Sequence, residues 1–156
     1  ALAFVTRRRS RFDFDGAATD QNTVPTELIE PVDLHRINPR EFEERVAYLI
    51  SLQGYKTQVC GGAGDGGIDV KVYDRDSKLI GVVQCKRYNP NKALPPMFVR
   101  EMATVKREQG VEVAYLATTA YFTEETRRYA KQVGVRLIDG RDLQRISRKA
   151  VQKSSV

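Results

Sequence analysis

The apolar positions of this chain change from helical spacing to strand spacing, and glycine and proline separate the segments. Asn38 and Pro39 form a start signal for a helix, and apolar residues then recur every three or four positions until Gly54. Residues 55–59 are predicted to form a short strand. The pattern therefore predicts a helix followed directly by a strand.

Residues 68–73 alternate apolar and polar side chains, as a strand with one buried face does. Residues 74–77 have the composition of a turn, and residues 78–88 form a second predicted strand, so the pair is expected to be an antiparallel hairpin. The simplest register places Asp69 opposite Val82. It predicts an apolar face with Ile68, Val70, Val72, Val83 and Cys85, and a polar face with Asp69, Lys71, Gln84 and Lys86.

The second half of the chain alternates helices with strands. The predicted order is a helix over residues 95–109, a strand over 111–118, a helix from Thr123 through Lys131, a strand over 135–138 and a helix over 139–148. The fold class is therefore α/β. We expect a central mixed sheet with an antiparallel hairpin and parallel additions, flanked by helices on both faces.

The 156 residues suffice for one domain, which we place at residues 34–150, between a polar linker over 1–33 and a tail over 151–156. The formal charge of +6 favours a polyanionic partner or a membrane surface. Two cysteines without CxxC spacing indicate a reduced, cytosolic setting.

The start of the chain is apolar over residues 1–5 and basic over residues 7–11. That order resembles the cytoplasmic end of a transmembrane helix, which gives the hypothesis of a membrane anchor in upstream sequence. Five apolar residues cannot span a bilayer. A fragment boundary beside a basic linker is the alternative.

The hairpin carries residues suited to phosphodiester hydrolysis with a divalent cation. Asp69 and the Gln84 carbonyl offer hard oxygen ligands for Mg²⁺, with Mn²⁺ as a substitute, and Lys86 offers positive charge near a phosphate. Glu43 on the first helix is a further candidate ligand, because it borders the apolar stripe, whereas Glu44 should face solvent. Taken singly, Gln84 fits a solvated strand residue, Lys86 an edge-strand lysine and Glu43 a helix-surface carboxylate.

Glycines at positions 62, 64 and 67 match the GxGxxG spacing of dinucleotide-binding folds, but a strand follows them where that fold requires a helix. We therefore expect no small-molecule cofactor. A loop that a nucleic-acid backbone can approach is the simpler interpretation. The residues expected to contact DNA are Asp65, Gly66, Gly67, Arg87, Lys92, Arg127 and Arg128.

Several motifs resemble those of one family. They are Glu41-Phe42-Glu43, Gly64-Asp65-Gly66-Gly67-Ile68-Asp69-Val70, Gln84-Cys85-Lys86-Arg87-Tyr88, Thr118-Thr119, Tyr129-Ala130 and Leu137-Ile138-Asp139-Gly140. In this order they resemble the Mrr-like restriction endonucleases of the PD-(D/E)xK nuclease superfamily. The resemblance runs from about Pro39 to Leu143.

The resemblance implies a restriction-endonuclease-like core and a magnesium-dependent endodeoxyribonuclease of DNA restriction-modification, with Asp69, Gln84, Lys86 and Glu43 as its site residues. Gln84 stands where the wider superfamily has Asp or Glu, and glutamine is usual in the Mrr-like branch. Cutting both strands would be easiest for a homodimer. The alternatives are a Holliday-junction-resolving nuclease, a catalytically silent DNA-binding module and a basic membrane-peripheral scaffold.

Overall fold

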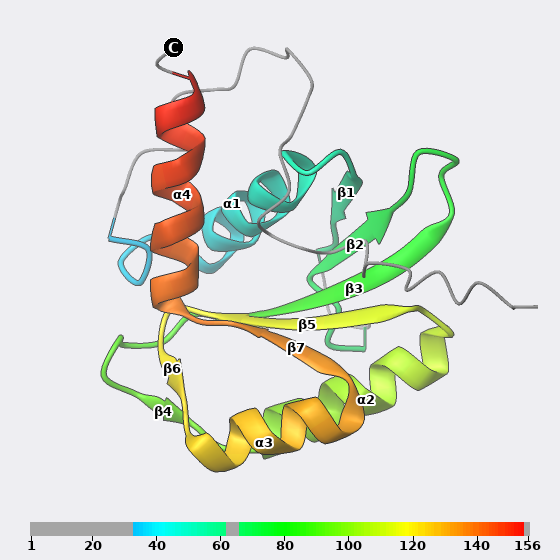
Figure 1. The fold of residues 1–156 in the computed structure, drawn as a ribbon, viewed down its shortest axis with the longest axis vertical. Helices are drawn as coiled ribbons and strands as arrows, with labels where there is room; N and C mark the ends of the chain where they lie inside the picture. Colours follow the sequence, from blue (N-terminus) through cyan, green and yellow to red (C-terminus); the bar gives the residue numbers. More distant parts are fainter. Residues whose placement is uncertain (1–32, 62–65, 155–156) are drawn as a thin grey trace, which may run out of the picture.

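The structure is a computed structural model that describes residues 33–61 and 66–154. Its elements follow the predicted order, with two additional two-residue strands (Figure 1). They are α1 (Pro39–Ser51), β1 (Lys56–Val59), β2 (Val70–Tyr73), β3 (Leu79–Lys86), β4 (Ala93–Leu94), α2 (Met97–Gln109), β5 (Val113–Thr118), β6 (Tyr121–Phe122), α3 (Glu124–Val133), β7 (Val135–Ile138) and α4 (Gly140–Ser154).

The main sheet has five strands in the order β1-β2-β3-β5-β7. The first three strands pair antiparallel, and β5 and β7 then add in parallel to β3. The expectation of a mixed sheet with an antiparallel hairpin is therefore confirmed. Because β3 lies between β2 and β5, Lys86 is not on an edge strand, and the edge-strand explanation of this lysine is wrong.

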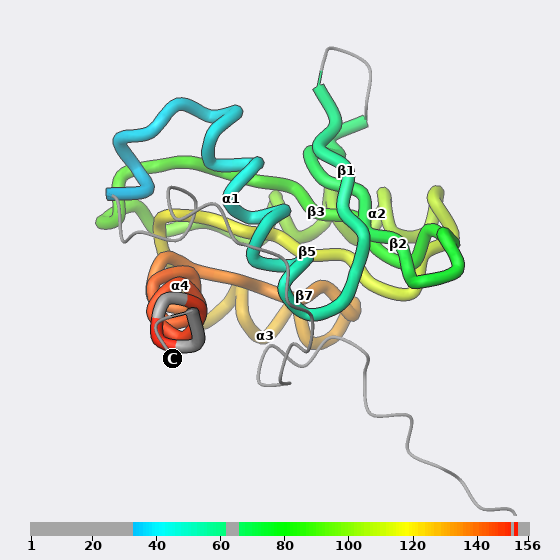
Figure 2. The backbone as a smooth tube through the Cα atoms, turned by 90° about the horizontal axis from the view of Figure 1, so that it is seen from above, coloured from blue at the N-terminus to red at the C-terminus, as the bar shows by residue number. Residues whose placement is uncertain are grey.

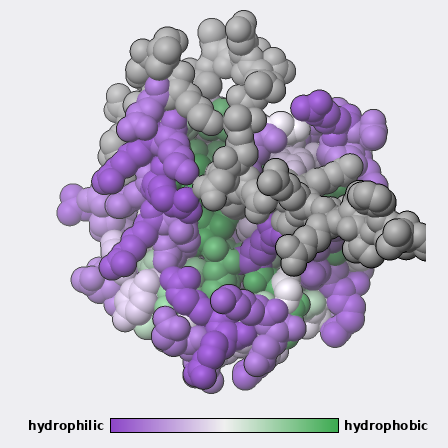
Figure 3. All heavy atoms as spheres, viewed as in Figure 1, coloured by the Kyte–Doolittle hydropathy of each residue, from purple (hydrophilic) through white to green (hydrophobic). Residues whose placement is uncertain are grey.

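Helices cover both faces of the sheet, as predicted. Helices α1 and α4 lie on one side, and α2 and α3 lie on the other (Figure 1). Seen from above, α4 is viewed end-on near β7, while β1 and β2 lie toward the opposite edge (Figure 2). Hydrophilic residues cover the outer faces of the helices, and hydrophobic residues are visible mainly along the middle, between the two helical layers (Figure 3).

The helices begin and end where the sequence signals lie. The Asn38 side chain accepts a hydrogen bond from the Glu41 N–H at 2.8 Å, and Thr123 accepts one from the Thr126 N–H at 3.1 Å. Gly110 ends α2 with φ of 61°, a left-handed conformation that glycine adopts without strain. Helix α4 continues to Ser154, beyond the predicted end at residue 148, as an amphipathic helix packed on α1.

The register of the hairpin differs from the prediction by two residues. Lys71, not Asp69, lies opposite Val82, and the register shifts between Val72 and Tyr73. The turn is longer than expected, because the Asp74 carboxylate accepts hydrogen bonds from backbone N–H groups as far as residue 78. A shift of two preserves the alternation, so the faces of β3 are as predicted.

The prediction that Ile68 shares a face with Val70 and Val72 is wrong. It is 5% exposed and packs in the cluster that contains Val82, on the α2 side, whereas Val70 and Val72 pack on the α1 side. The reason is that β2 begins at Val70, so the alternation does not extend back to Ile68. The predicted polar face is itself covered by α2 and α3, and Gln84 on it is buried.

The predicted linker over residues 1–33 lies outside the described residues, apart from Asp33. Within the part of the chain that the structure describes, no helix is both long and apolar enough to cross a membrane.

Candidate active site

Asp69 lies at the point where β2 and β3 separate. Its backbone N–H donates to the Val83 carbonyl at 2.8 Å, and its backbone carbonyl accepts from the Cys60 N–H at 2.8 Å. Its carboxylate Oδ2 accepts a hydrogen bond from the Cys85 N–H at 2.6 Å. Strand N–H groups point along the sheet toward the neighbouring strand, so this bond holds the carboxylate at the end of the sheet. Asp69 therefore contacts the residue that separates Gln84 from Lys86.

Gln84 and Lys86 lie two residues apart on β3 and share the face toward α2. Gln84 is 7% exposed, so it is not a solvated strand residue. Its side-chain oxygen Oε1 is buried and has no hydrogen-bond partner among the described residues. The Lys86 Nζ lies 5.1 Å from the centroid of the Phe98 ring and makes no ion pair with a described residue. Lys86 thus keeps its charge available for an anion.

Glu43 approaches from α1, on the opposite side of the sheet from α2. Its side chain is 19% exposed, against 48% for Glu44, as the sequence pattern predicted. Burial raises the pKa of the Glu43 carboxyl, and the nearby charge of Asp69 raises it further. Arg40 opposes this shift, with its Nη1 4.0 Å from Glu43 Oε2. The structure therefore brings Glu43 and Asp69 close enough to repel each other.

Cys85 lies beside the same two carboxylates. Burial raises the pKa of its thiol well above the usual value, and Asp69 and Glu43 add to the shift. The thiol therefore stays neutral, and its side chain packs with the apolar residues on the α1 side of the sheet.

The fit of these residues to a divalent cation can be judged from their own chemistry. Two carboxylates that repel each other and a buried amide oxygen without a partner are groups that a hard cation would satisfy. Within residues 33–61 and 66–154, no three His, Cys, Asp or Glu side chains gather as a cage. Asp69 and Glu43 fit the ion on this ground. Gln84 faces α2 whereas Glu43 lies on the α1 side, so the place of the Gln84 oxygen in the same donor set stays a prediction.

Gly67 lies close to the Gln84 side-chain amide. Gly66 and Gly67 are exposed and adopt positive φ, and a Cβ on Gly67 would lie 3.0 Å from the Gln84 Nε2. Asp65 lies outside the described residues. A side chain at position 67 would therefore press on the buried amide.

The basic residues expected to contact DNA are differently placed. The Arg87 Nη1 donates to the His35 carbonyl at 2.6 Å, so it holds the segment before α1. The Lys92 Nζ lies 3.8 Å from the Tyr88 ring centroid and remains exposed. Arg128 is exposed on α3. Their contact with DNA stays a prediction.

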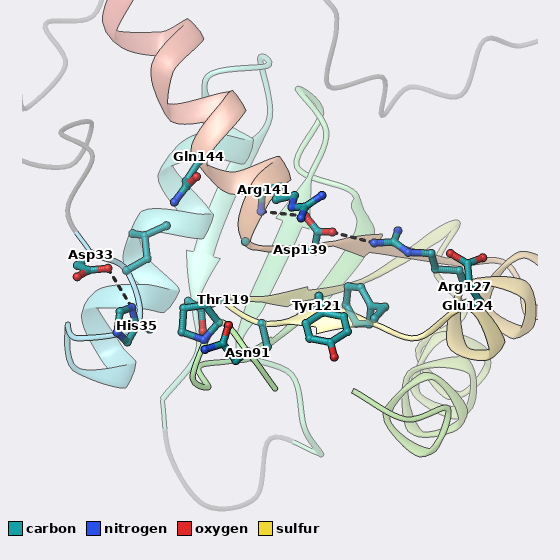
Figure 4. Close-up of a pocket in the computed structure, with 15 residues that line it drawn as sticks. Asp33, His35, Asn91, Thr119, Tyr121, Glu124, Arg127, Asp139, Arg141 and Gln144 are labelled. Carbon is teal, nitrogen blue, oxygen red and sulfur yellow. Dashed lines mark hydrogen bonds and ion pairs between the residues drawn. The ribbon is translucent and has the colours of Figure 1, made fainter. Parts of the chain in front are cut away.

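A polar cavity of about 570 Å³ opens beyond the carboxyl ends of β5 and β7 (Figure 4). Arg127 lines it and binds the buried Asp139 carboxylate at 2.8 Å. Burial alone would raise the pKa of Asp139, but the backbone N–H of Asp142 and the Arg127 guanidinium together lower it. Tyr121, which is 46% exposed, lines the same cavity.

The sequence did not predict the residues that position the candidate site residues through hydrogen bonds. The Cys85 N–H binds the Asp69 carboxylate, and the hydroxyls of Thr118 and Thr119 bind the chain on either side of Arg87. Two consecutive threonines at the end of an apolar strand were the only available signal.

Comparisons with known proteins show the family and the fold of this chain. A family model described as restriction endonuclease, that of the Mrr catalytic domain, matches residues 34–147. Among the curated proteins, none matches the chain at a significant level.

The chain is also similar to solved structures of restriction endonucleases. The MspJI enzyme in complex with a 27-mer oligonucleotide aligns with a TM-score of 0.59 and 18% identity, over 86% of this chain and 36% of that one. The modification-dependent enzyme AspBHI aligns with a TM-score of 0.56 and 21% identity, over 83% of this chain and 36% of that one. FokI aligns with a TM-score of 0.57 and 16% identity, over 86% of this chain and 29% of that one.

At such low identities these alignments establish a shared fold, and the chain spans only 29–36% of the length of the three enzymes. The family match covers most of the described residues, including Glu43, Asp69, Gln84 and Lys86. The chain belongs to the restriction endonuclease family of the Mrr catalytic domain.

Proposed function

We propose that this domain is a metal-dependent endonuclease that hydrolyses phosphodiester bonds in DNA. The observation that carries the proposal is the hydrogen bond from the Cys85 N–H to the Asp69 carboxylate, which fixes an acid beside the residue between Gln84 and Lys86. Membership of a restriction endonuclease family supports the same reaction class.

In this proposal Asp69, Glu43 and the Gln84 carbonyl hold Mg²⁺, with Mn²⁺ as a substitute. When bound, the ion supplies Lewis acidity toward a phosphate oxygen and a more acidic water. Lys86 orients the attacking water or stabilises the charge that develops on the phosphate. Asp69 and Glu43 have the firmer support, because they lie close enough for the charge of Asp69 to raise the pKa of Glu43, and a cation between them would relieve this repulsion. Gln84 is assigned from its unpartnered oxygen.

We place the DNA strand along the carboxyl ends of the strands, from the end of β3 toward the polar cavity. Thr119, which lines that cavity, follows the residue that pairs with Lys86, so the two sites adjoin. Ligands of open α/β sheets commonly bind beyond the carboxyl ends of the strands. Tyr121 offers an exposed ring for stacking on a base, and Arg127 keeps 40% of its side chain exposed for a phosphate.

The test is incubation of supercoiled plasmid with purified protein in magnesium, in manganese or in chelator. We expect nicked and linear products with either metal and none with chelator. A parallel series with branched DNA tests the junction-resolving alternative, and a series with modified plasmid tests whether cleavage depends on DNA modification. Binding of DNA without cleavage in every metal would replace the proposal with a catalytically silent module.

A further inference from the structure

The end of β3 that carries Lys86 is held by two threonine hydroxyls at the end of β5. Lys86 and Thr118 are the last register pair of the two strands. The Thr118 Oγ1 donates to the Lys86 carbonyl at 2.6 Å, and the Thr119 backbone N–H donates to the same oxygen at 3.4 Å. Farther along, the Thr119 Oγ1 donates to the Tyr88 carbonyl at 2.6 Å and accepts from the Tyr88 N–H at 2.8 Å. Side-chain hydroxyls therefore continue the pairing where the backbone ladder ends.

Packing alone does not require hydroxyls at these positions. Thr118, the last residue of β5, is 0% exposed, and Thr119, which follows the strand, is 6% exposed. Valine has the same branched shape as threonine, and at position 118 it suits a strand equally well. A buried hydroxyl is costly unless it is hydrogen-bonded. The Thr118 hydroxyl is fully used, because it also accepts from the Ala120 N–H at 3.1 Å. What the two hydroxyls add is therefore the attachment of residues 86–88 to β5.

Thr119 also affects the surroundings of the Lys86 side chain, through Tyr88 and Phe98. Tyr88, held at both its N–H and its carbonyl by Thr119, packs beside Phe98 with ring centroids 6.2 Å apart. The Phe98 ring is the one that borders the Lys86 ammonium. Thr119 thus fixes a neighbour of the ring, while Thr118 fixes the backbone of the lysine itself.

We propose that Thr118 and Thr119 are positioning residues that hold Lys86 in the geometry needed for DNA cleavage. We name the pair the threonine clamp. The inference rests on the proposed nuclease function, since the two residues act through Lys86 and not on the metal. A displacement of about 1 Å at a catalytic group can lower a rate about a hundredfold, so small movements of the Lys86 backbone matter.

The test compares Thr118→Val, which keeps the shape and removes the hydroxyl, with Thr118→Ser, which keeps the hydroxyl. Thr126→Val is the matched control, because Thr126 is also 0% exposed and its Oγ1 donates to the Leu94 carbonyl at 2.8 Å, away from Lys86. We expect Thr118→Val to lower kcat about tenfold or more, with KM for DNA within about twofold, and Thr118→Ser to restore most of the rate. The control should lose similar stability and keep its kcat.

Hydrogen exchange supplies a readout that does not depend on activity. Thr118→Val should speed exchange of the Ala120 amide, and Thr119→Val should speed exchange of the Tyr88 amide. Thr119→Val also serves as the second variant for kinetics if Thr118→Val does not fold. Protection that is unchanged in both variants would overturn the clamp.

The kinetic outcomes separate the two proposals. If the wild type cleaves DNA and Thr118→Val cleaves as fast as the Thr126→Val control, the clamp is overturned and the nuclease function stands. If the wild type cleaves no DNA with any metal, the proposed function fails, and the catalytic role of the clamp fails with it.

Discussion

Asp69 offers the sharpest single test, because its charge and its hydrogen bond can be removed separately. Asp69→Asn keeps an oxygen that can accept from the Cys85 N–H, which the Asp69 carboxylate now binds at 2.6 Å, and removes the negative charge. Asp69→Ala removes both. The proposed function predicts that both variants lose cleavage, whereas only the alanine variant loses the hydrogen bond.

The magnitudes follow from the two roles. Loss of a metal-binding carboxylate removes several kcal/mol of transition-state stabilisation, which is about a thousandfold or more in rate. An amide left without a partner costs about 1–3 kcal/mol when buried, and we expect the lower half of that range at this half-buried position. At about 4 °C per kcal/mol for a domain of this size, Asp69→Ala should melt about 4–8 °C below Asp69→Asn.

The assays are plasmid cleavage in magnesium and thermal unfolding in chelator, with the wild type beside both variants. Cleavage by Asp69→Asn at a rate close to that of the wild type would refute the metal-binding role of the carboxylate. Equal melting temperatures for the two variants would refute the structural role of the hydrogen bond.

Three further outcomes are expected. Burial and the charge of Asp69 raise the pKa of Glu43 in the folded protein. The stability that the protonated Glu43 contributes is therefore present at low pH and is lost as the pH rises through this raised pKa. Glu43→Gln should therefore unfold at higher urea than the wild type at pH 7 in chelator and lose that advantage under acid; a less stable variant at pH 7 would contradict this. The lowered pKa of Asp139 gives the opposite pH dependence. The stability that the Asp139 carboxylate contributes is present above the ordinary pKa of 3.8 and is lost as the pH falls through the lowered pKa of the folded protein. Asp139→Asn should be less stable than the wild type at neutral pH, and the difference in their free energies of unfolding should disappear in acid. A difference that does not change with pH in urea titrations would count against the ion pair with Arg127. Stacking on an exposed aromatic ring is worth about 1–3 kcal/mol per base, so Tyr121→Ala should weaken DNA binding about fivefold or more by fluorescence anisotropy. Met97→Ala, at a second exposed large apolar side chain, is the control, and equal affinities would remove Tyr121 from the DNA path.

Most of the fold was predictable because local signals agreed with the tertiary structure. The start of α1 at Pro39, the end of α2 before Gly110 and the parallel addition of β5 and β7 all followed from patterns of period, caps and turns. The short strands β4 and β6 were missed, since two-residue strands depend on distant pairing and leave no periodic signal.

The hairpin shows where local patterns fail. Alternation fixed which residues of β3 share a face, but the turn held by Asp74 set a register that composition could not reveal. The interpretation of the Gln84 face of the hairpin as solvent-exposed was also wrong, because it depended on the local pattern alone. Helices α2 and α3 cover that face, so Gln84 is buried by elements that follow it in the chain.

For the site, the residue types and spacings predicted Asp69, Gln84, Lys86 and Glu43, and the structure places Glu43 within electrostatic reach of Asp69. The residues that hold them in place were not predictable. A backbone N–H such as that of Cys85 has no sequence signal, and a threonine hydroxyl acquires its partner only when two strands pair.

The central claim is that Asp69 and Glu43, with the Gln84 carbonyl, hold a divalent cation. Anomalous diffraction from crystals of the protein grown with Mn²⁺ tests it most directly. The account predicts a peak about 2–2.5 Å from the carboxylate oxygens of Asp69 and Glu43, which is absent in Asp69→Asn. A peak bound elsewhere, or none in a crystal form whose protein cleaves DNA with Mn²⁺, would contradict it.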